Sequence, residues 1–162
     1  EPWESPFPNL LSKQRVNPVV KIWEPDKESK ADKYPIIGTT YRVTEHWQSG
    51  TMTRNLPWLA EIVPNVYVEM SESLAKEKGI KSGDKVVISN ARGEITAYAM
   101  VTKRLKPFRV NGELVEVIGI PWHFGFNGVA SGEPANRLTP HVGDGNTMIP
   151  EYKAWLCDIR RA

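Results

Sequence analysis

Short apolar runs separated by turn residues dominate the chain from residue 34 onward, and this pattern is typical of a β-rich domain. The Asn111-Gly112 pair between two such runs is a strong signal for a two-residue hairpin. Several short strands without a long amphipathic segment favour a closed barrel over a layered α/β fold. The predicted strands are 34–37, 67–70, 85–89, 94–101, 108–110, 113–117 and 154–159.

Two short helices are predicted between these strands. The first has Asn55 as its N-cap and ends before Pro64. The second begins after Ser71, which is expected to cap it, and stops at Gly79. Ile80 follows directly, where it can cover the last turn in a Schellman-type ending. The fold class expected is therefore mainly β with short helices.

The first 33 residues differ from the rest of the chain. Five prolines interrupt any helix or strand ladder, and residues 26–33 are almost wholly charged. The stretch also holds Trp3, Phe7 and Trp23, which are too apolar for a free linker. We therefore expect residues 1–33 to form an extended arm that packs on the rest of a larger subunit, with the barrel over residues 34–162. A chain that opens without Met is expected to be a piece of a longer product.

Composition narrows the class of protein. A chain of 162 residues with 40% hydrophobic and 25% charged residues is long enough to bury a core. The formal net charge of +2 comes without a basic stripe, so no nucleic-acid partner is expected. No apolar run approaches the roughly 20 residues of a membrane helix, so this chain is expected to make no membrane contact.

The possible metal ligands are few. Cys157 is the only cysteine, so this chain alone cannot hold an iron–sulfur cluster or a multi-cysteine zinc site. The spacing of His46, His123 and His141 matches no ligand motif. We therefore expect no metal site formed by this chain and a buried Cys157 in the last strand.

A polar run over residues 38–55 is the first candidate site. It follows a predicted strand and contains six Ser and Thr hydroxyls, Glu45 and His46 but little that can pack a core. Ordering such a loop costs entropy unless it binds something polar. Gly50 with its neighbouring backbone N–H groups suits phosphate, and Arg42 and Arg54 can add charge-assisted bonds. On composition alone, a solvated surface loop is the stronger interpretation.

Two later segments add candidates. In the run 119–128, two aromatic residues flank His123 and glycines permit close backbone approach, although an aromatic plug at a barrel end explains the same residues. The segment 136–153 reads as a turn-rich loop that begins near Asn136 and ends at Tyr152 and Lys153. A solvated surface lysine is the alternative interpretation of Lys153.

Together these motifs resemble a known family. Thr40-x-Arg42, Glu45-His46-Trp47 and the run 49–54 are similar to the opening motif of the C-terminal molybdopterin-dinucleotide-binding domain of the dimethyl-sulfoxide-reductase superfamily. The stretch 67–86 resembles the double-psi β-barrel of that domain. The run 121–130 and the lead-in 1–19 resemble formate dehydrogenases more than nitrate reductases.

The resemblance implies a catalytic (alpha) subunit of a molybdenum- or tungsten-dependent formate dehydrogenase. Such an enzyme oxidises formate reversibly to carbon dioxide on a bis(pterin guanine dinucleotide) cofactor, and electrons leave through an iron–sulfur cluster elsewhere in the enzyme. It further implies two partners, the remainder of the large subunit and an iron–sulfur electron-transfer subunit, and a periplasmic location. This chain lacks the metal-ligand motif and is expected to be inactive alone.

The resemblance also assigns the site residues. None is expected to be catalytic or to bind metal. An Asn amide can read the edges of a pterin ring, and a Lys ammonium can meet phosphate. The expected cofactor contacts are Thr40, Arg42, His46, Trp47, Ser49, Gly50, Thr51, His123, Asn136, Tyr152 and Lys153.

Two alternatives stay open on the sequence. The first is the same domain in a periplasmic-type nitrate reductase or another oxidoreductase of the superfamily. The second is a stand-alone barrel that serves as a binding or assembly module without redox function. Association with larger chains through residues 1–33 would count against the second.

Overall fold

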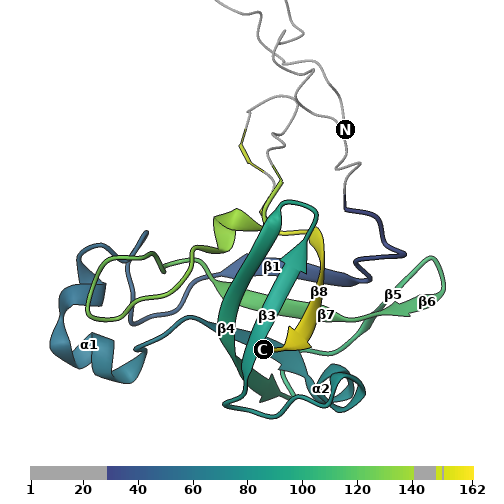
Figure 1. The fold of residues 1–162 in the computed structure, drawn as a ribbon, viewed down its shortest axis with the longest axis horizontal. Coiled ribbons are helices and arrows are strands. Elements are labelled where there is room, and N and C mark those ends of the chain that lie inside the picture. The colour runs from purple at the N-terminus through teal and green to yellow at the C-terminus, as the bar shows by residue number, and fades with distance from the viewer. Residues whose placement is uncertain (1–28, 141–148, 151) are drawn as a thin grey trace, which may run out of the picture.

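A computed structural model describes residues 29–140, 149–150 and 152–162, and the account below is confined to them. Six strands close into a barrel in the order β1-β7-β2-β4-β3-β8, and two more form a separate hairpin (Figure 1). The strands are β1 (Ile36–Tyr41), β2 (Tyr67–Ser71), β3 (Lys85–Asn90), β4 (Gly93–Thr102), β5 (Phe108–Val110), β6 (Glu113–Val115), β7 (Val117–Pro121) and β8 (Trp155–Arg161). The helices are η2 (Thr53–Asn55), α1 (Pro57–Ile62), α2 (Glu72–Lys78) and η3 (Ala135–Arg137).

The strand pairing confirms the predicted double-psi barrel. β1 runs parallel to β7, and β2 runs parallel to β4, while the antiparallel pairs β2–β7, β3–β8 and β1–β8 join these units and close the barrel. The predicted hairpin of β3 and β4 is confirmed, with Asn90 opposite Gly93 at its turn. Alternating side chains of the strands enter one core, which includes Val68, Met70 and Ile88.

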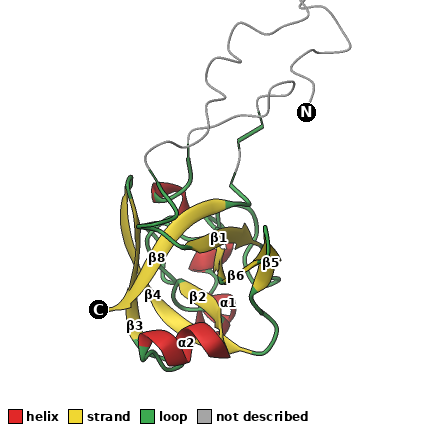
Figure 2. Ribbon diagram, turned by 90° about the vertical axis from the view of Figure 1, so that its right-hand side faces the viewer, coloured by secondary structure: helices red, strands yellow, loops and turns green. Residues whose placement is uncertain are grey.

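α2 has the predicted ends. The Ser71 side chain accepts a hydrogen bond from the Leu74 N–H at 3.0 Å, which satisfies one free donor of the first turn. Gly79 stops the helix in the left-handed region at φ 65°, and the Ile80 N–H donates to the Ala75 carbonyl at 2.9 Å. This is the Schellman pairing, and it places Ile80 in the core. Figure 2 shows α2 below the barrel.

The predicted cap of the other helix is wrong. Leu56, with no side-chain cap hydrogen bond, stands at the N-cap of α1, and Asn55 ends the 3-10 turn η2 before it. The Asn55 side chain instead donates to the Thr51 carbonyl at 2.8 Å. Pro57 occupies the first turn of α1, where its missing N–H costs nothing.

Three strand boundaries also differ from the prediction. β1 continues to Tyr41, so the polar run begins inside a strand, where Gly38 and Thr40 are buried. The run 119–128 is not wholly a loop, because residues 119–121 complete β7. The predicted strand 113–117 divides at Glu116, whose carboxylate accepts from Ser71 Oγ at 2.6 Å.

Two lobes flank the barrel. α1 and η2 lie on one side, and the β5–β6 hairpin extends from the other side (Figure 1). The Asn111-Gly112 turn of that hairpin has positive φ at both positions, as its sequence predicts. No helix within the described residues is long and apolar enough to cross a membrane. Residues 1–28, which make up most of the predicted arm, lie outside the described residues, as do His141 and the rest of 141–148.

Candidate functional site

A cavity of about 710 Å³ opens at one end of the barrel. Its walls come from the end of β1, the residue after β7, the turn η3 and the segment that leads into β8. The lining residues are Thr40, Arg42, Trp122, Asn136, Thr139, Pro140, Pro150, Tyr152 and Lys153. Five of the eleven predicted cofactor contacts therefore converge on one cavity.

Parallel pairing brings two of these segments together. β1 and β7 share a register in which Thr40 lies opposite Ile120 and Tyr41 lies opposite Pro121. Parallel strands reach the same end of the barrel, and the pairing continues as the Trp122 N–H donates to the Tyr41 carbonyl at 3.2 Å. The strand register thus sets Thr40 and Trp122 beside the same opening.

The segment before β8 is fixed to β1 by hydrogen bonds. Thr40, whose residue is only 2% exposed, donates from Oγ1 to the Tyr152 carbonyl at 3.0 Å. The Lys153 ammonium donates to the Thr40 carbonyl at 2.6 Å. These bonds hold Tyr152 and Lys153 in the cavity wall. Lys153 is an exposed residue with this one strong bond, so its contact with a cofactor stays a prediction beside the alternative of a surface lysine.

The electrostatics of the cavity favour an anion. Arg42 and Lys153 both line it, whereas none of the lining residues that the structure describes is Asp or Glu. Burial and the charge of Arg42 together lower the pKa of Lys153 from its ordinary value. The Arg42 guanidinium also lies 5.9 Å from the Trp122 ring centroid, and the Lys153 ammonium lies 5.1 Å from that of Tyr152. A ligand with negative charge and planar rings matches this set.

His123 stands behind the cavity wall as a structural link. It is 1% exposed, and its ring stacks on Trp122 with centroids 5.0 Å apart. Nε2 accepts from the Val43 N–H at 2.9 Å, and Nδ1 therefore donates to the Gln48 carbonyl at 2.5 Å. Burial lowers the pKa of His123, in keeping with a neutral ring that donates at one nitrogen and accepts at the other.

The other predicted contacts follow Arg42 in the loop 43–51. His46 is buried, its Nε2 donates to the Val63 carbonyl at 2.9 Å, and its ring meets Phe124 edge-on. Its Nδ1 has no hydrogen-bond partner within the described residues. Trp47, Ser49 and Thr51 are exposed on this loop. None of the four lines the cavity, so their contact with the cofactor stays a prediction.

Gly50 has a packing role at the centre of this loop. Its φ is 76°, and an added Cβ would lie 2.2 Å from the His123 carbonyl oxygen. The Gly50 N–H, which the sequence analysis considered as a phosphate ligand, donates to the Trp47 carbonyl at 2.8 Å. Only glycine lets the loop approach His123 this closely.

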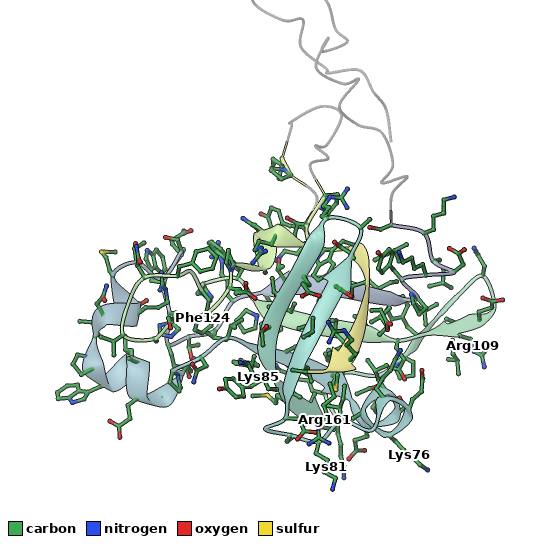
Figure 3. The ribbon with its side chains drawn as sticks, in the orientation of Figure 1. Lys76, Lys81, Lys85, Arg109, Phe124 and Arg161 are labelled. Carbon is green, nitrogen blue, oxygen red and sulfur yellow. The ribbon has the colours of Figure 1, made fainter. Side chains whose placement is uncertain are left out.

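Arg54 does not face an open anion site. It is 4% exposed, and its Nη1 donates to the carbonyls of Gly125, Asn127 and Ala130. Burial lowers its pKa. The expected phosphate contact is therefore replaced by a clamp that joins the polar run to the loop 125–130. Figure 3 shows Phe124, which precedes that loop, on the α1 side of the barrel.

Trp122 is one of four cavity residues that the sequence interpretation missed, the others being Thr139, Pro140 and Pro150. It is half-buried, lies between Arg42 and His123, and contributes an aromatic face to the cavity wall. Its position beside His123 in an aromatic run was the available signal. Within the described residues, no group of three or more His, Cys, Asp or Glu side chains could hold a metal ion.

Comparison with known proteins identifies the family. The profile of the "Molydopterin dinucleotide binding domain" family matches residues 36–156. The chain belongs to this family. The cofactor that this membership implies is molybdopterin guanine dinucleotide with molybdenum or tungsten.

Similar curated proteins are much longer than this chain. It is 48% identical, over its whole length, to "Formate dehydrogenase subunit alpha" of Megalodesulfovibrio gigas and to "Formate dehydrogenase, nitrate-inducible, major subunit" of Escherichia coli K12. It is 46% identical to "Formate dehydrogenase 2 subunit alpha (cytochrome c-553)" of Nitratidesulfovibrio vulgaris. The chain spans 16% of each of these relatives.

A solved structure shares the fold. Acetylene hydratase from Pelobacter acetylenicus superposes with a TM-score of 0.59 over 82% of this chain and 19% of that protein. The sequences are 16% identical, so this likeness establishes the fold alone.

Proposed function

We propose that this chain is the cofactor-binding domain of a formate dehydrogenase catalytic subunit. In this role the cavity at the end of the barrel holds part of a pterin guanine dinucleotide that carries molybdenum or tungsten. When bound, that cofactor supplies the centre for the two-electron, reversible oxidation of formate to carbon dioxide. The residues of this chain bind and orient the dinucleotide and take no catalytic step.

The single observation that carries the proposal is the cavity with two cations and, in the part of the chain that the structure describes, no lining carboxylate. The charge of Arg42 helps to lower the pKa of Lys153, so the charged form of Lys153 is disfavoured in the empty cavity, and a bound diphosphate would offset this effect. The Asn136 side chain offers both a donor and an acceptor to a base edge. Trp122 and Tyr152 supply aromatic surface for a ring. The hydrogen-bond donors of the cavity lining and the size of the cavity both suit part of a dinucleotide.

The loop 43–51 is proposed to continue the cofactor site beyond the cavity. It leaves β1 next to Arg42, and His123 fixes its backbone at Val43 and Gln48. Its exposed hydroxyls at Ser49 and Thr51 lie 3.4 Å apart and remain accessible to a polar ligand. The buried Nδ1 of His46 is a further free hydrogen-bonding group within the described residues.

Formate is favoured over nitrate as the substrate of the whole enzyme. The three relatives named above are all called formate dehydrogenases and are 46–48% identical across essentially the entire chain. The resemblance of the run 121–130 points the same way. This family assignment also argues against a stand-alone assembly module.

The partners and the compartment follow from the same proposal. The rest of the large subunit would carry the metal ligand, and an iron–sulfur subunit would accept the electrons. A periplasmic location is proposed by analogy with respiratory formate dehydrogenases. Fractionation of cells into periplasm and cytoplasm, followed by immunodetection of this chain, tests that location.

Calorimetric titration with GDP tests the cavity, because GDP carries both a guanine and a diphosphate. We expect Arg42→Met and Lys153→Met each to weaken GDP binding about tenfold, as loss of one charge-assisted bond predicts. Lys76→Met is the matched control, since Lys76 is exposed on α2 and lies near the lower end in Figure 3. Equal affinities of all three variants and the wild type would contradict the proposed site.

A further inference from the structure

The lobe that contains α1 exposes large apolar side chains outside the cavity lining. Each is more than half exposed, although side chains of this kind are ordinarily buried. They come from two segments, 52–62 and 126–129, and we call them together the apolar lobe. Its members are Met52, Leu56, Trp58, Ile62, Phe126 and Val129.

α1 has the reverse polarity of an ordinary surface helix. Ala60 is its one buried residue, whereas Trp58 is 84% exposed and Ile62 is 63% exposed. Residues four apart share a helix face, so Trp58 and Ile62 lie together on the face opposite Ala60. The helix therefore places its most apolar face away from its own domain.

Internal bonds hold the apolar lobe in shape. The Arg54 guanidinium is bound to three carbonyls of the loop 125–130, and the Ala130 N–H returns a bond to the Arg54 carbonyl at 3.0 Å. The Ser131 N–H donates to the Pro64 carbonyl at 3.2 Å. These bonds join the two segments that carry the exposed side chains. A surface fixed in this way loses little entropy when it becomes an interface.

The charge of this surface distinguishes between kinds of partner. Segments 52–62 and 125–130 contain two charged residues, the buried Arg54 and the exposed Glu61. An anionic membrane or a nucleic acid would require exposed lysines or arginines here. Interface cores between protein surfaces are instead poor in charge and rich in Trp, Phe and Met.

We propose that the apolar lobe is the surface on which another domain of the same large-subunit polypeptide packs. The inference rests on the proposed assignment to such a subunit, but it does not depend on cofactor binding in the cavity. Relatives that match all of this chain are about six times longer, since it spans 16% of them. Most of such a polypeptide is thus available to cover a patch that a soluble domain rarely leaves open.

Cysteine accessibility tests this proposal with a matched pair of positions. Ile62 and Leu114 are aliphatic residues with nearly equal exposure, 63% and 64%, and Leu114 lies on the β5–β6 hairpin across the barrel (Figure 1). Native Cys157 is fully buried, and burial raises the pKa of its thiol, so it should not react. Maleimide labelling rates of Ile62→Cys and Leu114→Cys are measured in the 162-residue chain and in the large subunit that contains it.

We expect both variants to react at similar rates in the 162-residue chain. In the large subunit, Ile62→Cys should react at least tenfold more slowly, while Leu114→Cys keeps its rate. Val129→Cys, on the other segment, is the second reporter if Ile62→Cys does not fold, and it should behave in the same way.

Three results would overturn the proposal. Unchanged labelling of Ile62→Cys and Val129→Cys in the large subunit would show that no domain covers the apolar lobe. Protection already present in the 162-residue chain would assign the surface to a second copy if it depends on concentration, and to residues 1–28 if it does not. Equal protection of Leu114→Cys in the large subunit would show that the protection is not specific to the apolar lobe. GDP titration of the same chain separates any of these failures from failure of the cavity proposal.

Discussion

The Lys153 ammonium donates to the Thr40 carbonyl oxygen at 2.6 Å, although 113 residues separate them in the chain. This bond, with the one from Thr40 Oγ1 to the Tyr152 carbonyl, joins the first barrel strand to the segment that enters the last. The cavity wall is thus assembled from both ends of the domain. Its geometry depends on Thr40 as well as on the charged residues.

Replacing Thr40 with valine should therefore affect both stability and binding. The substitution keeps the shape of the side chain but leaves the Tyr152 carbonyl without its donor. We expect the free energy of unfolding to fall by about 1–2 kcal/mol. GDP affinity should also fall, because the Tyr152 backbone loses its bond to β1 and only the bond from Lys153 to the Thr40 backbone carbonyl remains. Urea denaturation and calorimetry measure the two effects.

Thr39→Val is the control for that experiment. Thr39 is the neighbouring position in β1 and faces the opposite side of the strand, where it is half-buried. A Thr39→Val variant that loses as much GDP affinity as Thr40→Val would show that the cavity does not depend on the Thr40 anchor.

Gly50→Ala should destabilise the domain by about 2–4 kcal/mol. The substitution places a Cβ on a residue with left-handed backbone conformation, which is strained. The same Cβ would also collide with the His123 carbonyl oxygen. Gly79→Ala separates these two causes, because Gly79 also has positive φ but an added Cβ there meets nothing within 4 Å. Its cost should be only about 1 kcal/mol. Thermal unfolding of the two variants measures the difference, and equal costs would refute the tight packing at Gly50.

Acid should weaken the fold through His123. Its pKa is lowered by burial, so the unfolded chain binds a proton near pH 6.5 while the folded chain does not. Stability from this group is complete above pH 6.5 and declines as the pH falls toward the lowered pKa of the folded state. Protonation at Nε2 would also break the bond from the Val43 N–H, because two N–H donors would then face each other.

The His123→Gln variant isolates that contribution, since glutamine keeps one donor and one acceptor without titrating. We expect it to be less stable than the wild type at pH 7.5 and to lose less stability between pH 7 and pH 5. Urea midpoints at several pH values measure both slopes. Parallel slopes for the two proteins would show that His123 does not carry the acid sensitivity.

Much of the fold follows from local sequence signals. Ser71 and Gly79 bound α2 through caps that involve residues only a few positions away, and Asn111-Gly112 sets its hairpin by backbone conformation alone. Such features need no knowledge of the rest of the chain. The same locality explains why the hairpin of β3 and β4 was predicted with nearly correct limits.

The misassigned features depend on contacts distant in sequence. Polar Thr40 resembles a loop residue, but it lies in a strand because its backbone pairs with β7, and its buried hydroxyl donates to a carbonyl 112 residues away. Arg54 resembles a phosphate ligand, but its guanidinium donates hydrogen bonds to three carbonyls more than 70 residues away in the chain. No local pattern records either partner, so composition alone could not distinguish a binding arginine from a structural one.

The most direct test of the cavity is a ¹H–¹⁵N correlation spectrum of the 18.3 kDa chain recorded during titration with GDP. The account predicts the largest shift changes at the amides of Thr40, Arg42, Trp122, Asn136 and Lys153, together with little change along α2. Changes centred on α2, or no saturable change at any of these five amides, would contradict the claim that this cavity binds the dinucleotide.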